Sequence, residues 1–293
     1  MAKFIQILKD INELIVFKHS VFALPFIFVA MIVASKSANG SVWFGFELLI
    51  LGLFCAVSAR NFAMGANRYL DRDIDKDNPR CASRPSVDGR IGSKNLLIFI
   101  WLNALIFVVV AYFINSLAFW LSFPILAILG AYSYFKRFSS LAHVVLGICL
   151  GLSPIAGAIA VLADIPLWVI LLSCGVVFWV AGFDILYSLQ DMDYDKKKGL
   201  FSIPSIYGAQ ASMFICALFH FLTILFWLLF AISAKLGIIG FIGVAVSGII
   251  LYLEHRIVRR DFSKIDRAFF TLNLHFNALG YTRVHSDSLA ERI

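Results

Sequence analysis

Long runs of apolar residues dominate this chain, and short polar segments separate them. Eight runs have the composition of membrane helices, and they cover about 14–34, 43–66, 95–114, 117–135, 141–162, 167–189, 211–233 and 236–254. Each is close to the roughly 20 residues with which a helix crosses the hydrocarbon core of a bilayer. The pattern therefore predicts a single all-α membrane domain over residues 1–293, built as a polytopic bundle of eight transmembrane helices.

Composition supports a membrane protein and argues against a nucleic-acid partner. Of the 293 residues, 61% are hydrophobic and only 15% are charged, which is too apolar for a soluble domain of this length. The net charge of +7 comes from Lys and Arg residues in particular loops, not from a basic stripe on a soluble fold. We therefore expect the lipid bilayer to surround this chain, and we expect no nucleic acid to bind it.

The cysteines suggest no cross-linked framework. Five are present, four of them lie in apolar runs, and no CxxC pair occurs. The sequence thus predicts neither a set of disulfides nor a zinc site.

Lys and Arg residues concentrate in alternate connections between the apolar runs. The connection after the second run carries seven of them, from Arg68 to Lys94, whereas the odd-numbered connections hold only Lys36 and Lys235. Cytoplasmic loops of membrane proteins are enriched in Lys and Arg. The asymmetry predicts a multi-pass protein of the cell inner (cytoplasmic) membrane. Its N-terminus and the two acidic loops described below would face the cytoplasm.

The order of the runs indicates an internal duplication. An even number of spans separates the second and sixth runs, so both run in the same direction, and each ends in an acidic segment. This symmetry indicates two four-helix halves, about 14–135 and 141–254. Beyond them, the apolar stretch Ala268-Phe269-Phe270 is followed by Asn273 and other polar residues. The sequence leaves open whether a ninth transmembrane helix forms after Asn273.

The first acidic segment lies where the second apolar run ends. Asn67, Asp71 and Asp75 are spaced i, i+4, i+8, and they share one face if the helix continues. Their oxygen atoms suit a hard cation such as Mg²⁺. A solvated helix end is the simplest alternative explanation. A calcium loop is excluded because its sixth position is Lys76, where Gly is needed, and its twelfth is Ala82, where Glu is needed.

A second acidic cluster follows about 120 residues later, with Asp184, Asp191 and Asp195 spaced i, i+7, i+11 on one predicted helical face. Asp184 lies inside an apolar run, where a carboxylate is costly unless it faces a polar cavity or binds a proton. A structural hydrogen bond to a neighbouring helix would also explain a lone Asp there. Asp191 and Asp195 on the same face favour a functional site, whereas Asp73 and Asp193 point elsewhere and rank lower.

Together the clusters predict a site that holds a metal–diphosphate between two parallel helices. Carboxylates alone would repel a diphosphate, so a divalent metal must bridge them. Neutralising the diphosphate makes it a better leaving group. If the carbon that it leaves is allylic, its departure gives a delocalised carbocation. Asp71, Asp191 and Asp184 are the predicted catalytic carboxylates. The cations predicted to bind the diphosphate are Arg68, Arg72, Lys136, Arg137 and Lys196.

At these residues the chain resembles the UbiA superfamily of intramembrane prenyltransferases. Asn67, Asp71 and Asp75 match the family motif N-x-x-x-D-x-x-x-D, and Asp191 and Asp195 match its second motif, D-x-x-x-D. Further matches are Asp184, Tyr187 and Gly199 near the second motif, Arg60 before the first, and the segment Tyr132-Ser-Tyr-Phe-Lys136-Arg137. The first apolar run, from Lys18 and His19 to Phe26, is similar to the branch that prenylates 4-hydroxybenzoate.

This resemblance implies a helical bundle around a central cavity, usually of nine helices. It implies Mg²⁺ bound by Asn67, Asp71, Asp75, Asp191 and Asp195, a polyprenyl diphosphate donor and an aromatic acid acceptor. Tyr132 joins the predicted diphosphate-binding residues. Arg60, Lys18 and His19 are the predicted acceptor-binding residues, with diphosphate binding as an equal alternative for Arg60.

The expected function is Mg²⁺-dependent transfer of a polyprenyl group to an aromatic acid of the 4-hydroxybenzoate type in quinone biosynthesis. One alternative within the same class is prenylation of a dihydroxynaphthoate in menaquinone biosynthesis. An ion-coupled transporter is an alternative from another class, because intramembrane Asp residues and parallel repeats also suit transport. Transport sites lie near the midplane on broken helices, whereas these acids lie at the ends of apolar runs.

Overall fold

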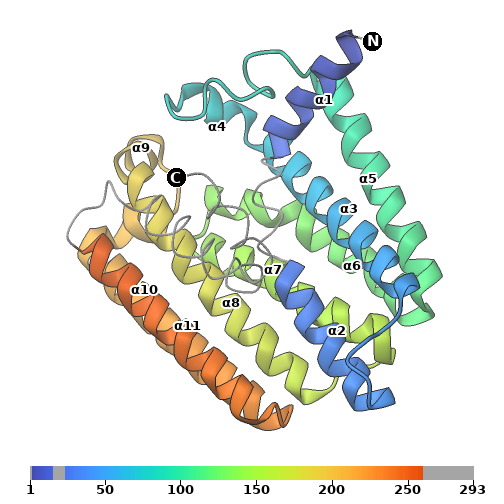
Figure 1. The fold of residues 1–293 in the computed structure, drawn as a ribbon. Helices are drawn as coiled ribbons and strands as arrows, with labels where there is room; N and C mark the ends of the chain where they lie inside the picture. The colour runs from blue at the N-terminus through green and yellow to red at the C-terminus, as the bar shows by residue number, and fades with distance from the viewer. Residues whose placement is uncertain (1, 16–23, 260–293) are drawn as a thin grey trace, which may run out of the picture.

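The structure is a computed structural model that describes residues 2–15 and 24–259, and every regular element in these ranges is helical (Figure 1). The long helices are α1 (Ala2–Ile15), α2 (Leu24–Asn39), α3 (Phe46–Leu70), α5 (Ser93–Ile114), α6 (Ser116–Ala131), α7 (Ala142–Leu162), α8 (Leu167–Ser188), α10 (Ile203–Ser233) and α11 (Gly237–Val258). Four short helices follow long ones. Helix α4 (Arg72–Asp77) follows α3, η2 (Tyr132–Arg137) follows α6, and η3 (Leu189–Asp191) and α9 (Met192–Lys198) follow α8. The predicted all-α class is confirmed.

The structure supports a protein that crosses the membrane several times. Within the described residues, seven helices are long and apolar enough to span a bilayer, and α2 is a shorter apolar helix of 16 residues. The prediction of eight full-length spans is therefore not confirmed. The predicted first helix, 14–34, also has the wrong limits, because Leu14 and Ile15 belong to α1 and α2 continues to Asn39.

Some sequence predictions concern residues outside the described ranges. Residues 16–23, with the predicted acceptor-binding Lys18 and His19, are among these, and so are residues 260–293, where a ninth helix was left open.

Helix α10 begins eight residues before its predicted start at 211, because a capping box starts the helix ahead of the long apolar run. The Ser202 hydroxyl accepts a hydrogen bond from the Ser205 backbone N–H, and the Ser205 hydroxyl accepts one from the Ser202 N–H. Gly208 then takes a non-helical conformation, with φ 79° and ψ 172°, which only glycine adopts at low cost. This kink separates the first turns from the transmembrane part of α10.

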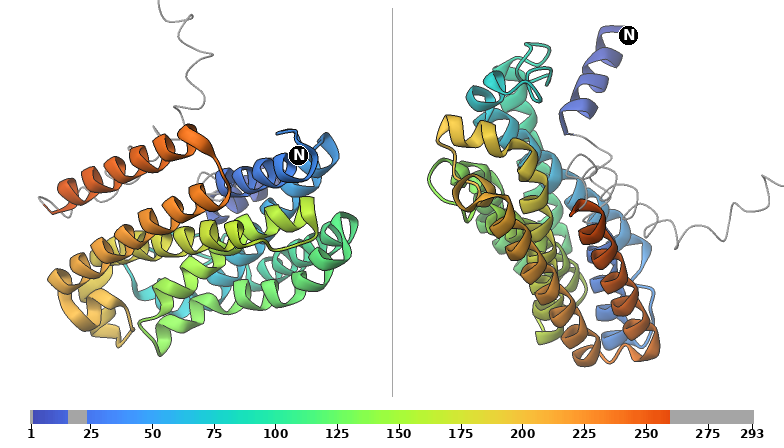
Figure 2. Two further views of the ribbon diagram at one scale, coloured as in Figure 1. Left: turned by 90° about the horizontal axis from the view of Figure 1, so that it is seen from below. Right: turned by 90° about the vertical axis from the view of Figure 1, so that its left-hand side faces the viewer.

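The bundle has two sides that meet along α7. Helices α3, α5 and α6 pack on one side and α8, α10 and α11 on the other (Figures 1 and 2). The backbones of α7 and α8 approach closely, because a Cβ atom at Gly147 would lie 2.4 Å from the carbonyl oxygen of Val177. Gly157 brings α7 equally close to α2, since its Cβ would lie 2.6 Å from the Ile27 carbonyl oxygen.

Helices α1, α4 and α9 gather at one end of the bundle (Figure 1). There, α1 is tied to the bundle by its last turns. The Arg68 Nε atom donates to the Leu14 carbonyl at 3.3 Å, and the Arg90 guanidinium forms an ion pair with Glu13 at 2.7 Å. This polar end of the bundle contains both acidic motifs.

Candidate active site

Each acidic motif sits at a break between a long helix and a short one. Helix α3 ends at Leu70 and α4 begins at Arg72, and between them Asp71 has φ −92° and ψ 5°. The shared face inferred for Asn67, Asp71 and Asp75 assumed that the helix continues, whereas the structure has two helices that meet at Asp71. The second motif has a similar break at Asp191, which ends η3 with φ −101° and ψ 3°. Asp is unfavourable inside helices and common at their ends, so breaks at these positions agree with its propensity.

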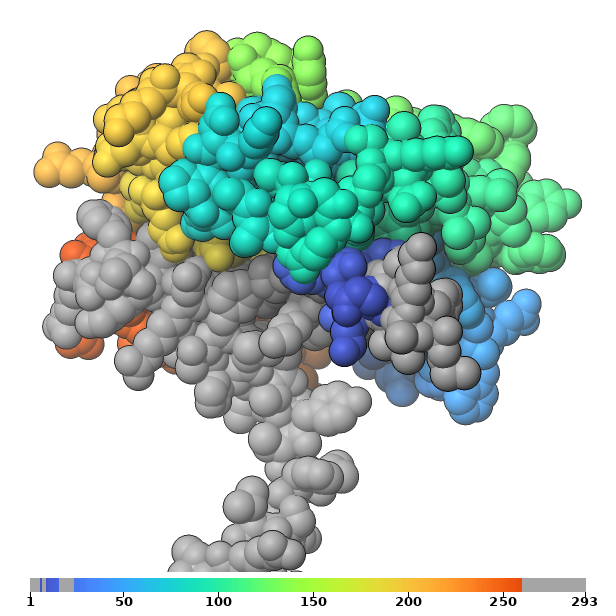
Figure 3. Space-filling model, turned by 90° about the horizontal axis from the view of Figure 1, so that it is seen from above, coloured from blue at the N-terminus to red at the C-terminus, as the bar shows by residue number. Residues whose placement is uncertain are grey.

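The two acidic segments lie side by side. The Tyr194 hydroxyl in α9 donates to the Ile74 carbonyl in α4 at 2.6 Å, and Lys198 Nζ lies 2.5 Å from Asp77 Oδ2. Figure 3 shows this end of the molecule, where the teal segment around α4 adjoins the gold segment around α9. Segments about 120 residues apart therefore form one acidic surface.

Three carboxylates of the two motifs have cationic partners. Lys136 Nζ lies 2.7 Å from Asp71 Oδ2, and Arg84 Nη1 lies 2.5 Å from Asp75 Oδ2. Arg80 forms an ion pair with Asp191. The loop after α4 thus supplies two cations, of which Arg80 joins the first motif to the second.

Asp71 is the carboxylate whose surroundings satisfy it least. It is 2% exposed, and its Oδ2 atom also accepts a hydrogen bond from Asn67 Nδ2 at 2.7 Å. Its Oδ1 atom is buried and has no hydrogen-bond partner. Burial raises the pKa of Asp71, although Lys136 acts in the opposite direction. A buried carboxylate oxygen without a partner is costly, and a bound cation would satisfy it.

Arg137 holds the neighbouring Asp73 and not Asp71. Its two terminal nitrogens bind the Asp73 carboxylate at 2.9 and 2.7 Å, and one also donates to the Leu70 carbonyl at 2.8 Å. This guanidinium lowers the pKa of Asp73 to about 2. Arg137 therefore ties η2 to the end of α3, close to the Lys136–Asp71 pair.

Asp184 is held by a histidine that the sequence analysis did not select. His143 Nδ1 lies 2.7 Å from Asp184 Oδ2, and His143 Nε2 accepts a hydrogen bond from the Ile203 backbone N–H at 3.1 Å. Because Nε2 accepts, the ring proton is on Nδ1, which donates to Asp184. One imidazole thus joins α7, α8 and the start of α10. Nothing in the sequence around His143 pairs it with Asp184, 41 residues away.

A cavity of about 270 Å³ lies between α2, α3, α5, α6 and α7, and its lining is mostly apolar. Arg60 and Tyr132 are the polar residues at its lining that the sequence analysis selected. The Nε atom of Arg60 is buried and makes no hydrogen bond. Arg60 therefore combines a place at the lining of an apolar chamber with an unpaired guanidinium N–H donor.

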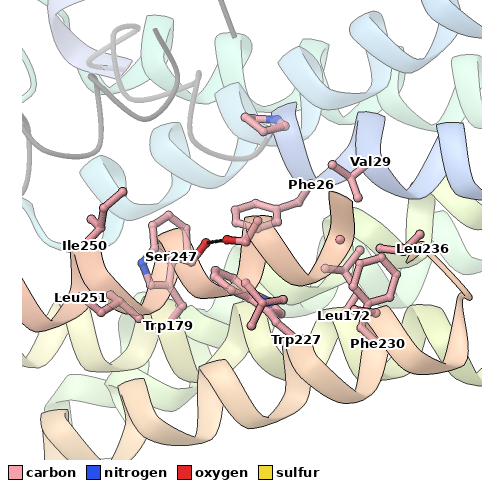
Figure 4. A pocket seen from close by; sticks show the side chains of 15 residues that line it. Phe26, Val29, Leu172, Trp179, Trp227, Phe230, Leu236, Ser247, Ile250 and Leu251 are labelled. Atoms are coloured by element: carbon pink, nitrogen blue, oxygen red, sulfur yellow. Dashed lines mark hydrogen bonds between the residues drawn. The ribbon is translucent and has the colours of Figure 1, made fainter. Parts of the chain in front are cut away.

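A second cavity, of about 280 Å³, lies between α2, α8, α10 and α11 (Figure 4). Its wall is aromatic, with the rings of Phe26 and Trp179 5.3 Å apart and those of Trp179 and Trp227 6.3 Å apart. Gly240 and Gly243 of α11 form part of the opposite wall. Ser247 is the polar side chain drawn there, and its hydroxyl donates to the Gly243 carbonyl. Such a lining suits a hydrocarbon chain.

Comparison with known proteins decides the family. The model of the UbiA prenyltransferase family matches residues 23–277. The chain belongs to this family. Two relatives are named 4-hydroxybenzoate octaprenyltransferase. The one from Cupriavidus pinatubonensis is 31% identical over 78% of this chain and 81% of its own length. The one from Haemophilus ducreyi is 30% identical over 69% of this chain and 72% of its own length.

Solved structures agree with this UbiA assignment. An apo UbiA homolog from Aeropyrum pernix K1 superposes with a TM-score of 0.79 at 29% identity, covering 88% of this chain and 94% of that one. A UbiA homolog from Archaeoglobus fulgidus, described as bound to DMAPP and Mg²⁺, has a TM-score of 0.68 at 16% identity, covering 90% of this chain and 96% of that one. At this identity, the Archaeoglobus structure supports the fold of this chain alone.

Within this UbiA fold, the predicted diphosphate-binding cations differ in how close they lie to the acidic motifs. Lys136 lies against Asp71, whereas Arg68 is 8% exposed and holds Leu14 and the Asn67 side chain. Arg72 stacks on the Tyr69 ring at 4.2 Å and binds Ser93, so its described contacts are outside the acidic cluster. Lys196 is exposed and forms no ion pair with any described residue.

Residues of the loop after α4 were missed. Besides Arg80 and Arg84, Asn78 donates its side-chain amide to Asp191 at 3.4 Å. The sequence does place these polar residues just after the first motif, but it does not show that the loop folds back over the second one.

Proposed function

We propose that this protein transfers a polyprenyl group from polyprenyl diphosphate to 4-hydroxybenzoate in ubiquinone biosynthesis. The observation that carries the proposal is that both acidic motifs lie together at one end of the bundle. The ion pair between Asp191 and Arg80 connects them. The names of the relatives supply the acceptor and the quinone pathway. Membership of a prenyltransferase family sets the transporter alternative aside.

The residues present fit a magnesium ion. Asn67, Asp71 and Asp75 on one motif and Asp191 and Asp195 on the other offer hard oxygen ligands. The Oδ1 atom of Asp71 is buried without a hydrogen-bond partner, and such a cation would bind to it. When bound, the ion would neutralise the diphosphate and make it a better leaving group.

The chain's own cations have a complementary role. Lys136, Arg80 and Arg84 now pair with carboxylates and are positioned to bind phosphate oxygens when substrate enters. In the reaction, the bond between the allylic carbon and the diphosphate oxygen breaks, and the diphosphate leaves with the electron pair. A carbon–carbon bond to the aromatic ring forms, and the ring proton passes to a base. Asp71, Asp191 and Asp184 are the carboxylates that we propose as catalytic in this reaction.

Arg60 is the proposed partner of the acceptor's carboxylate. Arg60 lines an apolar chamber and its buried Nε–H has no hydrogen-bond partner. A planar guanidinium can bind a carboxylate through two parallel hydrogen bonds. Lys18 and His19 remain predicted acceptor-binding residues, although they lie outside the described residues. The membrane orientation, with the N-terminus and both acidic loops in the cytoplasm, also remains a proposal.

The test is incubation of membranes that contain this protein with labelled polyprenyl diphosphate, Mg²⁺ and single aromatic acids, followed by measurement of product mass. We expect 4-hydroxybenzoate to give a product heavier by one prenyl group, with one hydrogen lost. Membranes without the protein are the control. A product formed only with a dihydroxynaphthoate would replace this proposal with the menaquinone alternative.

A further inference from the structure

Three side chains that bind soft metal ions meet between α10 and α11, away from the acidic motifs. Cys216 and His220 are four residues apart on α10 and therefore share one face of that helix. His255 comes from the last turn of α11. One ligand atom from each side chain lies within 4.8 Å of the other two. We propose that Cys216, His220 and His255 form a zinc site that joins these two helices.

The spacing of the ligand atoms fits a tetrahedral zinc ion. The Cys216 sulfur lies 4.0 Å from His220 Nδ1 and 3.8 Å from His255 Nε2, and the two nitrogens are 2.9 Å apart. Zinc bonds of about 2.3 Å to sulfur and about 2.05 Å to nitrogen would place the nitrogens roughly 3.3 Å apart and each nitrogen roughly 3.6 Å from the sulfur. Shifts of about half an ångström or less reach that geometry. A fourth coordination position stays open.

A glycine on α8 fixes the orientation of one ligand. A Cβ atom at Gly182 would lie 2.7 Å from both Cδ2 and Nε2 of His220, so the imidazole occupies the space that a side chain there would fill. With its Nε2 edge against α8, the ring directs Nδ1 toward His255. His220 and Cys216 are 3% and 0% exposed, respectively, so the site is dry on the α10 side.

The Cys216 thiol is the ligand that favours a metal cation. Coordination removes its proton to water, so Cys216 contributes one negative charge. That charge lowers the cost of placing Zn²⁺ among membrane helices. Thiolate and imidazole ligands select zinc over the hard Mg²⁺ ion proposed for the acidic motifs.

A pocket adjoins the site. A pocket of about 380 Å³ opens beside His255, and its other lining residues are Ala217, Tyr252, Arg256 and Arg259. Of the three ligands, His255 is the one that lines this pocket. This pocket therefore reaches one of the three proposed ligands. The sequence indicated no zinc site because it contains no CxxC pair.

A hydrogen bond between the two imidazoles would explain the 2.9 Å contact without a metal, so the experiment must separate the two explanations. The full chain is purified in detergent, freed of any affinity tag and treated with chelator. Co²⁺ is then added as a spectroscopic substitute for zinc, with Mg²⁺ in excess to occupy the acidic motifs. We expect one equivalent of Co²⁺ to bind with a thiolate-to-cobalt charge-transfer band, which oxygen ligands do not produce.

Matched variants assign the band. Cys216→Ser should abolish it, and His255→Ala should weaken Co²⁺ binding at least tenfold. Cys174→Ser, which replaces a cysteine of α8 outside the cluster, should keep the full band. Zn²⁺ should displace Co²⁺ from the wild-type protein. A wild-type protein without the band, or a band that persists in Cys216→Ser, would overturn the proposal. Because no step of this experiment measures prenyl transfer, its outcome is independent of the proposed function.

Discussion

Asp71 and Asp191 have nearly the same backbone conformation at the ends of two different transmembrane helices. Their φ and ψ angles are −92° and 5° for Asp71 and −101° and 3° for Asp191, and a short helix follows each. We propose that the two residues are equivalent positions in a duplicated four-helix unit, with halves of about 14–135 and 141–254. The break turns α4 and α9 toward each other, so that each half contributes one acidic motif to a shared site.

Lys136 should act on the prenyl donor. Lys136→Gln removes a charge that lies 2.7 Å from Asp71 and next to the proposed diphosphate site. A charge-assisted hydrogen bond contributes about 1.5–3 kcal/mol, so the KM for polyprenyl diphosphate should rise roughly tenfold to a hundredfold. The KM for the aromatic acid should stay nearly constant. Lys197→Gln, which changes an exposed lysine of α9, is the control. An unchanged KM for the donor in Lys136→Gln would remove this role.

Arg60 should act on the acceptor. Arg60→Lys keeps the positive charge but loses the planar pair of donors, so the KM for the aromatic acid should rise about tenfold. The KM for polyprenyl diphosphate should change less than about twofold if Arg60 binds only the acid. Steady-state kinetics with each substrate varied in turn gives both values. Arg90→Lys, at a surface ion pair with Glu13, controls for the substitution type. A rise confined to the donor would assign Arg60 to the diphosphate.

Variants of Asp184 and His143 should separate an effect on catalysis from an effect on stability. Asp184→Asn keeps an oxygen that can accept from His143 Nδ1–H but loses the charge. We expect thermal unfolding close to that of the wild type and a large loss of kcat. His143→Leu removes hydrogen bonds to both Asp184 and Ile203 and should cost about 2–4 kcal/mol of stability. Asp184→Asn with a normal kcat would leave Asp184 as a structural hydrogen-bond partner of α7.

The membrane orientation can be measured directly. Cysteines introduced at Asp77 and Lys197, both exposed, should resist an impermeant thiol reagent added to intact cells and should react once the cells are permeabilised. A cysteine introduced at Asp164, in the exposed connection between α7 and α8, should react in intact cells. The unmodified chain gives the background from its native cysteines. Rapid labelling of the Asp77 or Lys197 position from outside would reverse the proposed orientation.

The sequence predicted the features that depend on composition and regular spacing. Apolar runs located the transmembrane part of most helices, and the two motifs located the acidic surface. The break at Asp71 was missed because i, i+4 spacing is equally compatible with a continuous helix. The early start of α10 was missed because Ser202 and Ser205 stabilise a polar helix start that does not resemble a membrane span.

Contacts between distant segments were beyond sequence reasoning. His143 lies in an apolar run that contains no acidic residue, and only the packing of α7 against α8 reveals Asp184 as its partner. The pairing of Arg80 with Asp191 depends on how the loop after α4 folds. The cluster of Cys216 and His255 depends on the packing of α10 against α11. Each of these contacts comes from tertiary packing, which the spacing of residues along one helix does not determine.

The central claim is that both acidic motifs act together on a metal-bound diphosphate. The most direct test measures diphosphate release and prenylated acid together in purified protein, with and without Mg²⁺. The account predicts equal amounts of both products in the wild type and no detectable product in excess chelator. It also predicts a loss of at least about a thousandfold in Asp71→Asn and in Asp191→Asn, because each removes a metal ligand. Asp193→Asn, an exposed position in the same motif as Asp191, should keep near-normal rates. Full prenyl transfer in excess chelator, or wild-type rates in either variant, would contradict the account.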